Sequence, residues 1–294
     1  MDGALVGSEY ASHLTDADLR LLASVARGPE DASWLRGDPG ALVGLLGDPR
    51  VFEAVFGPGD NFGEASGGRA IPVSPFLTFA VAVHRSAAEL ASVDHVAERS
   101  GATRQRVPLF DVPDLRDFLG SQARRLFLAE LLASFTRVAS GRYRVRGGGR
   151  PRTRRFSELD PVRLAGLLDG VPDADRPGVY RRLGDVSLFL AGVFPDYAAA
   201  YAFAPVGAAA LLRAAQVPAG QHERLAEAPA IELLEYVGAR WYRAACRLAP
   251  LRTARLDVVG EVADRFRQAR RVLNHIADRY LFGTGSAWFA PPAP

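Results

Sequence analysis

The sequence contains no lysine, so all 36 basic residues of its 294 are arginines. Without a lysine amine the chain cannot form a P-loop, a lysine Schiff base or the phosphate-binding lysine of a protein kinase. It also lacks a G-x-S-x-G nucleophile elbow and a dinucleotide-binding glycine fingerprint in a βαβ unit. These absences exclude several large classes of enzyme and favour a non-enzymatic protein.

Cysteine is nearly absent as well. The single residue, Cys246, excludes an intramolecular disulfide and any zinc cluster built from cysteines. Its helical context predicts a small core residue and not a nucleophile.

The five histidines do not form a recognisable metal motif. His84 and His95 are expected on one helix, where eleven residues separate them by roughly 16 Å, too far to share an ion. Di-iron bundles use E-x-x-H motifs, and the chain has none. We therefore expect no metal site and no cofactor.

Long apolar runs are also missing. The longest, at 197–204, is stopped by Pro205, whereas a membrane-spanning helix needs about 20 apolar residues. The first residues show neither a basic region nor an apolar core typical of a signal peptide. With 48% hydrophobic and 23% charged residues, the chain is expected to be a globular cytoplasmic protein without a membrane span.

Helical patterns dominate what is present, and they predict a mainly α fold: a multi-helix bundle in one or two lobes with one inserted β-hairpin. The expected division is an N-terminal helical lobe (1–140), the hairpin (141–157), a C-terminal bundle (158–283) and a tail (284–294). Helices are expected at Thr15–Gly28, Asp38–Gly47, Asp48–Phe56, Ser74–Arg99, Asp111–Phe135 with a bend at Gly120, Asp160–Leu168, Pro177–Phe194, Val206–Gln216, Ala228–Leu248 and Leu256–Leu281.

The hairpin is predicted from a segment of unusual charge. Residues 142–155 (RYRVRGGGRPRTRR) contain seven arginines and no acid, while the remaining 29 arginines face 33 acids. Arginines alternate with other residues on both sides of three glycines, and this pattern is typical of two strands joined by a tight turn. The candidate binding residues are Arg142, Tyr143, Arg144, Arg146, Arg150, Arg152, Arg154 and Arg155.

The simplest register pairs Arg146 with Arg150, Arg144 with Arg152 and Arg142 with Arg154. Six guanidinium groups would then share one face, which is unfavourable without an anion or an anchor. Three interpretations remain open: a solvated or internally paired hairpin, a nucleic-acid contact, and a contact with an acidic protein or an anionic membrane surface.

A second candidate site lies among the later helices. An ionised Asp185 on the apolar helix 177–194 needs a partner, and an arginine forming an internal salt bridge is the simplest one. Arg240, Arg243 and Arg247 share a helical face and are expected to be solvated. The residues that could line a pocket between helices are Asp185, Tyr197, Tyr236, Arg240 and His275.

From about Arg124 to Ala277 the order of features resembles an uncharacterised family of bacterial, mainly α-helical proteins. The segments that carry the resemblance are RRLFLAELLASFTR, the arginine-rich hairpin, RRLGDVSLFLAGVFPDY, YVGARWYRAA and VLNHIADRY. The resemblance implies a helical fold and no catalytic residue, and it leaves out the first 110 residues.

These observations favour a binding or regulatory protein that contacts a polyanion (DNA or RNA), or else an acidic protein surface, through the hairpin. The alternative is an enzyme or carrier for a small, largely apolar molecule held between helices. Self-association into a homo-oligomer is also open.

Overall fold

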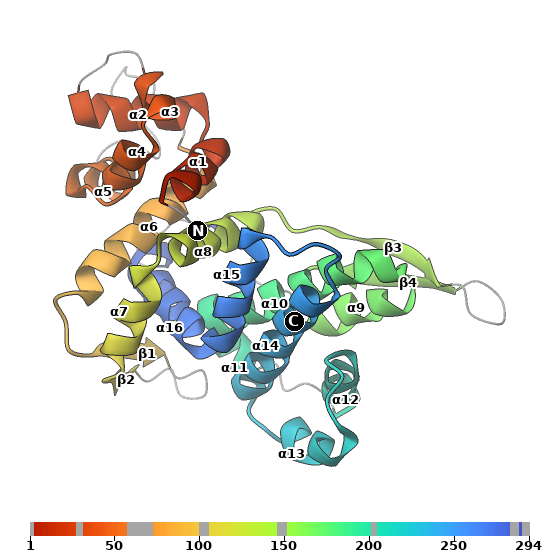
Figure 1. The fold of residues 1–294 in the computed structure, drawn as a ribbon. Helices are drawn as coiled ribbons and strands as arrows, with labels where there is room; N and C mark the ends of the chain where they lie inside the picture. Colours follow the sequence, from red (N-terminus) through yellow and green to blue (C-terminus); the bar gives the residue numbers. More distant parts are fainter. Residues whose placement is uncertain are drawn as a thin grey trace, which may run out of the picture. The chain divides into compact units, whose positions relative to one another are not determined.

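The computed structural model describes residues 3–27, 32–57, 73–99, 106–145, 152–200, 205–282 and 288–289. Helices dominate, and the strands among the described residues form two separate two-stranded sheets (Figure 1). The predicted mainly α fold with a β-hairpin is therefore confirmed. None of the described helices combines the length and the apolar character needed to cross a membrane.

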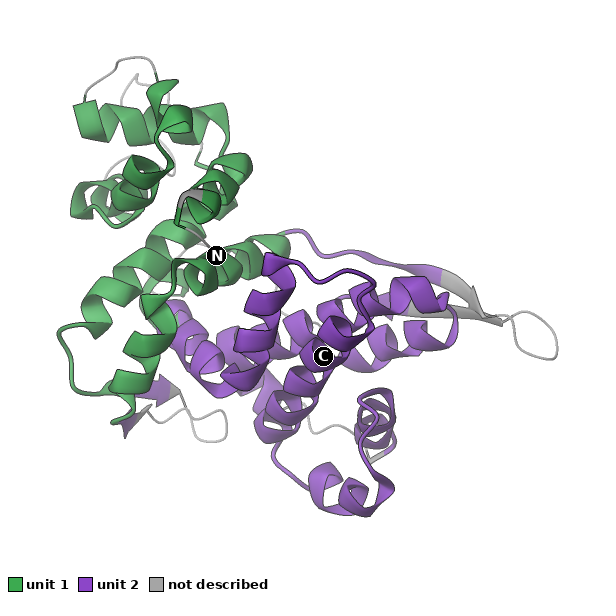
Figure 2. Cartoon of the chain, in the orientation of Figure 1, with its two compact units in different colours: residues 1–96, 110–136, 278–288 green, residues 97–109, 137–277, 289–294 purple. Residues whose placement is uncertain are grey.

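The chain divides into two compact units, each assembled from separate stretches (Figure 2). Unit 1 comprises Met1–Val96, Phe110–Thr136 and Asp278–Trp288. Unit 2 comprises Ala97–Leu109, Arg137–Ala277 and Phe289–Pro294.

Unit 1 is built from helices whose starts follow standard capping chemistry. Thr15 and Asp18 form a capping box, with Asp18 Oδ2 accepting from the Thr15 amide at 2.8 Å and the Thr15 hydroxyl accepting from the Asp18 amide at 3.2 Å. Three further helices begin with a capping side chain followed by proline. The helices are α1 (Gly3–His13), α2 (Asp16–Arg27), α3 (Trp34–Gly37), α4 (Pro39–Leu46), α5 (Pro49–Phe56), α6 (Pro75–Leu90), α7 (Val112–Gly120) and α8 (Gln122–Ser134).

Helix α6 ends earlier than its sequence predicts. It stops at Leu90, and His95 precedes a strand, β1 (Val96–Arg99), which pairs with β2 (Arg106–Leu109). The prediction of one helix through Arg99, with His84 and His95 on the same face, is therefore wrong. Arg116 of α7 donates to the carbonyl of Leu90 and so occupies an acceptor at this helix end.

Unit 2 follows the predicted order of helices. Besides β2 and most of β1, its elements are β3 (Ser140–Val145), β4 (Arg152–Ser157), α9 (Pro161–Ala165), η1 (Gly166–Asp169), η2 (Asp173–Asp175), α10 (Arg176–Val193), α11 (Pro195–Ala200), α12 (Pro205–Ala214), η3 (Ala219–Gln221), α13 (His222–Ala226), α14 (Ala230–Leu248), α15 (Ala254–Asp264) and α16 (Phe266–Ile276). A π-helical turn, η4 (Ala277–Leu281), follows α16 and crosses the boundary between the units.

The predicted single helix at 256–281 is divided. Arg265 adopts φ −120° and ψ 34°, outside the helical region, and separates α15 from α16. The apolar stripe continues through this break, which explains why periodicity alone predicts one helix.

Helix α10 is the centre of unit 2, as its apolar composition predicts. Every residue from Leu183 to Val193 is buried, and the helix packs along α14 and α16. Glycines permit this close packing: a Cβ atom at Gly192 would come within 2.7 Å of Leu273, and one at Gly238 within 2.5 Å of Phe266.

Candidate functional site

The arginine-rich hairpin forms as predicted, but in a different register. Strands β3 and β4 are antiparallel, and the pairs are Arg142 with Arg155, Tyr143 with Arg154, Arg144 with Thr153 and Val145 with Arg152. The predicted pairs Arg142–Arg154 and Arg144–Arg152 are therefore wrong by one residue. The third predicted pair, Arg146–Arg150, lies outside the described residues.

This register divides the arginine positions between the two faces of the ladder. Paired positions share a face of the ladder, and successive positions along a strand alternate between the two faces. A shift of one residue in the register therefore moves every arginine of one strand to the opposite face relative to the other strand. We call one side the polar face, and its positions are Ser140, Arg142, Arg144, Thr153, Arg155 and Ser157. We call the other the mixed face, with Gly141, Tyr143, Val145, Arg152, Arg154 and Phe156. The expectation of six arginines on one face is wrong; the polar face has three among the described positions.

The base of the hairpin is anchored to unit 2. Glu158, just past β4, accepts hydrogen bonds from the Ala139 amide at 2.9 Å and from the Arg182 guanidinium of α10 at 3.1 Å. At the same end, a Cβ atom on Gly141 would lie 2.8 Å from the ring of its pairing partner, Phe156. The hairpin therefore has the anchor that an isolated two-stranded ribbon lacks.

The acids at this base are engaged elsewhere. Besides Glu158, the next acid is Asp160, whose Oδ1 caps α9 through the amides of Val162 and Arg163. Its other oxygen pairs with the Arg163 guanidinium at 3.0 Å. Arg142 is exposed and forms no ion pair with any residue that the structure describes. Among the side chains that the structure describes, the partners of these two acids thus lie on α9 and α10.

The residues of the alternative pocket have separate roles in unit 2. Asp185 accepts from the Arg181 guanidinium and from the buried Tyr242 hydroxyl, both at 2.8 Å. The predicted salt bridge thus forms within α10, and a tyrosine links Asp185 to α14. Tyr236 donates to Gln221 at 2.9 Å and lies six residues from Tyr242, about 9 Å along the helix.

Arg240 lies one turn after Tyr236 on α14, with its guanidinium carbon 5.9 Å from the centroid of the Tyr236 ring, and the other two candidates lie on different helices. Arg240 donates to the backbone carbonyls of Ala215 at 3.0 Å and Gln216 at 2.8 Å, so it caps the end of α12. Tyr197 lies on α11 and His275 on α16. Arg243 and Arg247 are exposed, as the prediction of a solvated face requires, and Arg243 also forms a surface ion pair with Asp264 at 2.9 Å.

Cys246 behaves as a structural residue. Its thiol donates to the carbonyl of Leu256 at 3.3 Å, and burial raises its pKa. A raised pKa reduces the thiolate fraction, so the surroundings do not activate a nucleophile.

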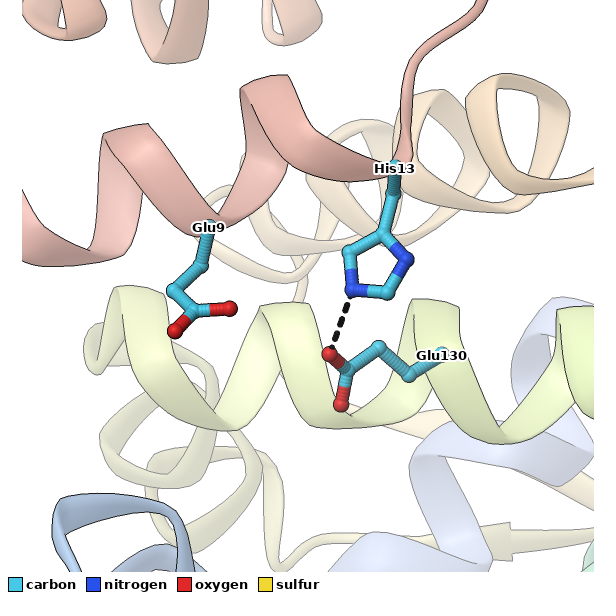
Figure 3. A group of neighbouring side chains, drawn as sticks. All are labelled: Glu9, His13 and Glu130. Carbon is cyan, nitrogen blue, oxygen red and sulfur yellow. Dashed lines mark hydrogen bonds and ion pairs between the residues drawn. The ribbon is translucent and has the colours of Figure 1, made fainter.

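A cluster of metal-ligand type occurs in unit 1 (Figure 3). Glu9 and His13 lie one turn apart on α1, and Glu130 comes from α8; one ligand atom from each lies within 4.8 Å of the others. His13 Nε2 is 2.8 Å from Glu130 Oε1. Sequence reasoning missed this group because it searched for E-x-x-H, whereas the spacing here is E-x-x-x-H, and Glu130 is remote in sequence.

Comparison with protein-family models, with curated proteins and with solved structures finds no match to this chain. The fold and the sites define a mainly α protein with an anchored, arginine-rich β-hairpin.

Proposed function

We propose that this protein binds a polyanion through the hairpin, with nucleic acid favoured over an acidic protein surface. The polar face supplies the principal contacts. The binding residues are Arg142, Tyr143, Arg144, Arg146, Arg150, Arg152, Arg154 and Arg155, the same set that the sequence suggests.

The observation that carries the proposal is the direct pairing of Arg142 with Arg155. Like charges at paired positions destabilise a ladder, and the acids at the base are committed to Arg182 and to α9. An anion supplied from outside the molecule relieves this repulsion. Phosphates suit the task because a guanidinium binds their oxygens through two parallel hydrogen bonds.

The size of the element favours a duplex. A two-stranded β-ribbon fits the major groove of DNA, which is about 12 Å wide. Arginine positions on both faces of such a ribbon can reach phosphates on both sides of the groove, and Tyr143 adds a surface on which an unpaired base can stack.

The test is binding of labelled duplex DNA and of RNA, measured over a range of salt concentrations. If all seven arginines contact phosphates, affinity should fall by about 6,000-fold between 50 and 200 mM salt. Replacing Arg144, Arg146, Arg150 and Arg152 together by alanine should reduce the slope of log affinity against log salt by about 3 to 4.

A matched control removes four arginines outside the hairpin. Arg163, Arg213, Arg224 and Arg252 are exposed in unit 2, and their replacement by alanine lowers the net charge equally. This control should bind almost as tightly as the wild type. A wild-type protein that binds neither nucleic acid at low salt, or a control as weak as the hairpin variant, would contradict the proposal.

A further inference from the structure

We propose that Glu9, His13 and Glu130 form a binding site for a divalent transition-metal ion, with Zn²⁺ as the preferred ion. The site is in unit 1 and does not depend on the hairpin. Its ligands are one imidazole nitrogen and two carboxylates, drawn from two helices (Figure 3).

The spacing of the ligands suits one ion. Residues at i and i+4 project from the same side of a helix, so Glu9 and His13 are neighbours on α1. Zinc–ligand bonds of about 2.0 to 2.2 Å place tetrahedral ligand atoms about 3.4 Å apart. His13 and Glu130 are now at 2.8 Å and the whole group is within 4.8 Å, so side-chain adjustments of about 1 Å complete the geometry.

The helix that carries two of the ligands is held firmly. Tyr10, between them in sequence, is fully buried and its hydroxyl is 3.1 Å from His84 Nε2 on α6. The His13 ring stacks on Phe76 of the same helix, with ring centroids 4.6 Å apart and planes 29° apart. The imidazole is therefore oriented in advance, which lowers the entropy lost on binding an ion.

The kind of ligand selects the kind of ion. Imidazole suits zinc and its neighbours in the transition series, whereas calcium and magnesium take oxygen ligands almost entirely. Two carboxylates balance the charge of a divalent cation, and three protein ligands leave one position open for water. His13 is exposed, so an ion can enter from solvent and exchange.

The consequence for the fold is a link between α1 and α8. An ion bound only by the native arrangement stabilises unit 1, and the stabilisation grows with the logarithm of the ion concentration above the dissociation constant. We therefore expect Zn²⁺ to raise the melting temperature of the full-length protein.

The experiment is calorimetric titration of the metal-free, full-length protein with Zn²⁺, supported by Co²⁺ absorption spectra that report nitrogen and oxygen coordination. One ion should bind per chain, and Glu9→Gln, His13→Ala and Glu130→Gln should each weaken binding at least tenfold, on the order of the effect of disturbing a ligand shell. His95→Ala and Asp114→Asn, both exposed in unit 1, are the controls and should bind as the wild type does.

Two results would overturn the proposal. One is no binding of Zn²⁺ by the wild type, and the other is wild-type affinity for Zn²⁺ in all three ligand variants. The conservative Glu9→Gln and Glu130→Gln variants keep the test informative if His13→Ala unfolds. The hairpin variants should retain Zn²⁺ binding, so failure of this site and failure of polyanion binding are distinguishable.

Discussion

Replacement of Gly184 by alanine should lower the free energy of unfolding by about 3 kcal/mol, the upper part of the usual range for overpacking a core. A Cβ atom at this position would overlap ring carbons of Tyr242. That ring cannot move aside easily, because it is fully buried and its hydroxyl is bonded to Asp185 at 2.8 Å. The two helices of this contact, α10 and α14, form the centre of unit 2, so the loss of stability affects the whole unit.

Gly178 provides the matched control on the same helix. Nothing lies within 4 Å of a Cβ atom built there, and the residue is exposed. Alanine at this position should therefore stabilise the protein, by about 0.5 kcal/mol, because alanine loses less conformational entropy in a helix than glycine does. Chemical denaturation of both variants measures the difference. Equal stabilities would show that α10 and α14 do not pack as closely as described.

The second large effect is a loss of stability in acid that depends on His84. Burial, with a smaller contribution from the nearby Arg125 guanidinium, lowers the pKa of His84 to about 3. The groups that face it are the Tyr10 hydroxyl of α1 and Arg125 of α8. Neither carries the negative charge with which a carboxylate would stabilise an imidazolium.

The sign of the effect follows from proton binding. In the unfolded chain the histidine takes up a proton below its ordinary pKa of about 6.5, whereas in the folded protein it stays neutral down to about pH 3. The unfolded state thus binds more protons in this window, and stability falls as pH decreases. The contribution of His84 is fully present above pH 6.5 and is reduced by about 3 kcal/mol at pH 4.

The glutamine variant of His84 isolates this contribution. Its side chain does not titrate and keeps a polar partner for the Tyr10 hydroxyl. Unfolding measured between pH 7 and pH 4 should show a flatter decline for His84→Gln than for the wild type. His95→Gln, at an exposed position, should decline as the wild type does. Identical slopes for the wild type and His84→Gln would exclude a buried neutral histidine.

The helices of this chain can be predicted from sequence because their signals are local. Each signal spans only neighbouring residues of its own helix. Examples are the Asp-Pro and Ser-Pro starts of α4, α5 and α6 and the apolar stretch of α10. The break at Arg265 could not be predicted, because the apolar stripe is continuous on both sides of it. The end of α6 depends on a tertiary contact, the hydrogen bond from Arg116 to Leu90.

For the hairpin and for the Glu9–His13–Glu130 group, too, the sequence predicts the local pattern but not the contacts between distant segments. Alternating arginines predict the hairpin correctly, but the register depends on how many residues separate the strands, and the ladder ends at Val145 and Arg152. In the proposed metal site, the spacing of Glu9 and His13 is visible in the sequence. The third ligand, Glu130, becomes a neighbour only when α8 packs on α1.

The most direct test of polyanion binding compares two double variants of the hairpin, each lacking two arginines. The variant Arg142→Ala with Arg155→Ala removes the two arginines that pair directly on the polar face. The variant Arg152→Ala with Arg154→Ala removes the two arginines of the mixed face, which do not pair with each other. We expect both to bind duplex DNA more weakly than the wild type, with the polar-face variant at least about tenfold weaker than the other. Equal affinities for both variants and the wild type would contradict a binding role for the hairpin.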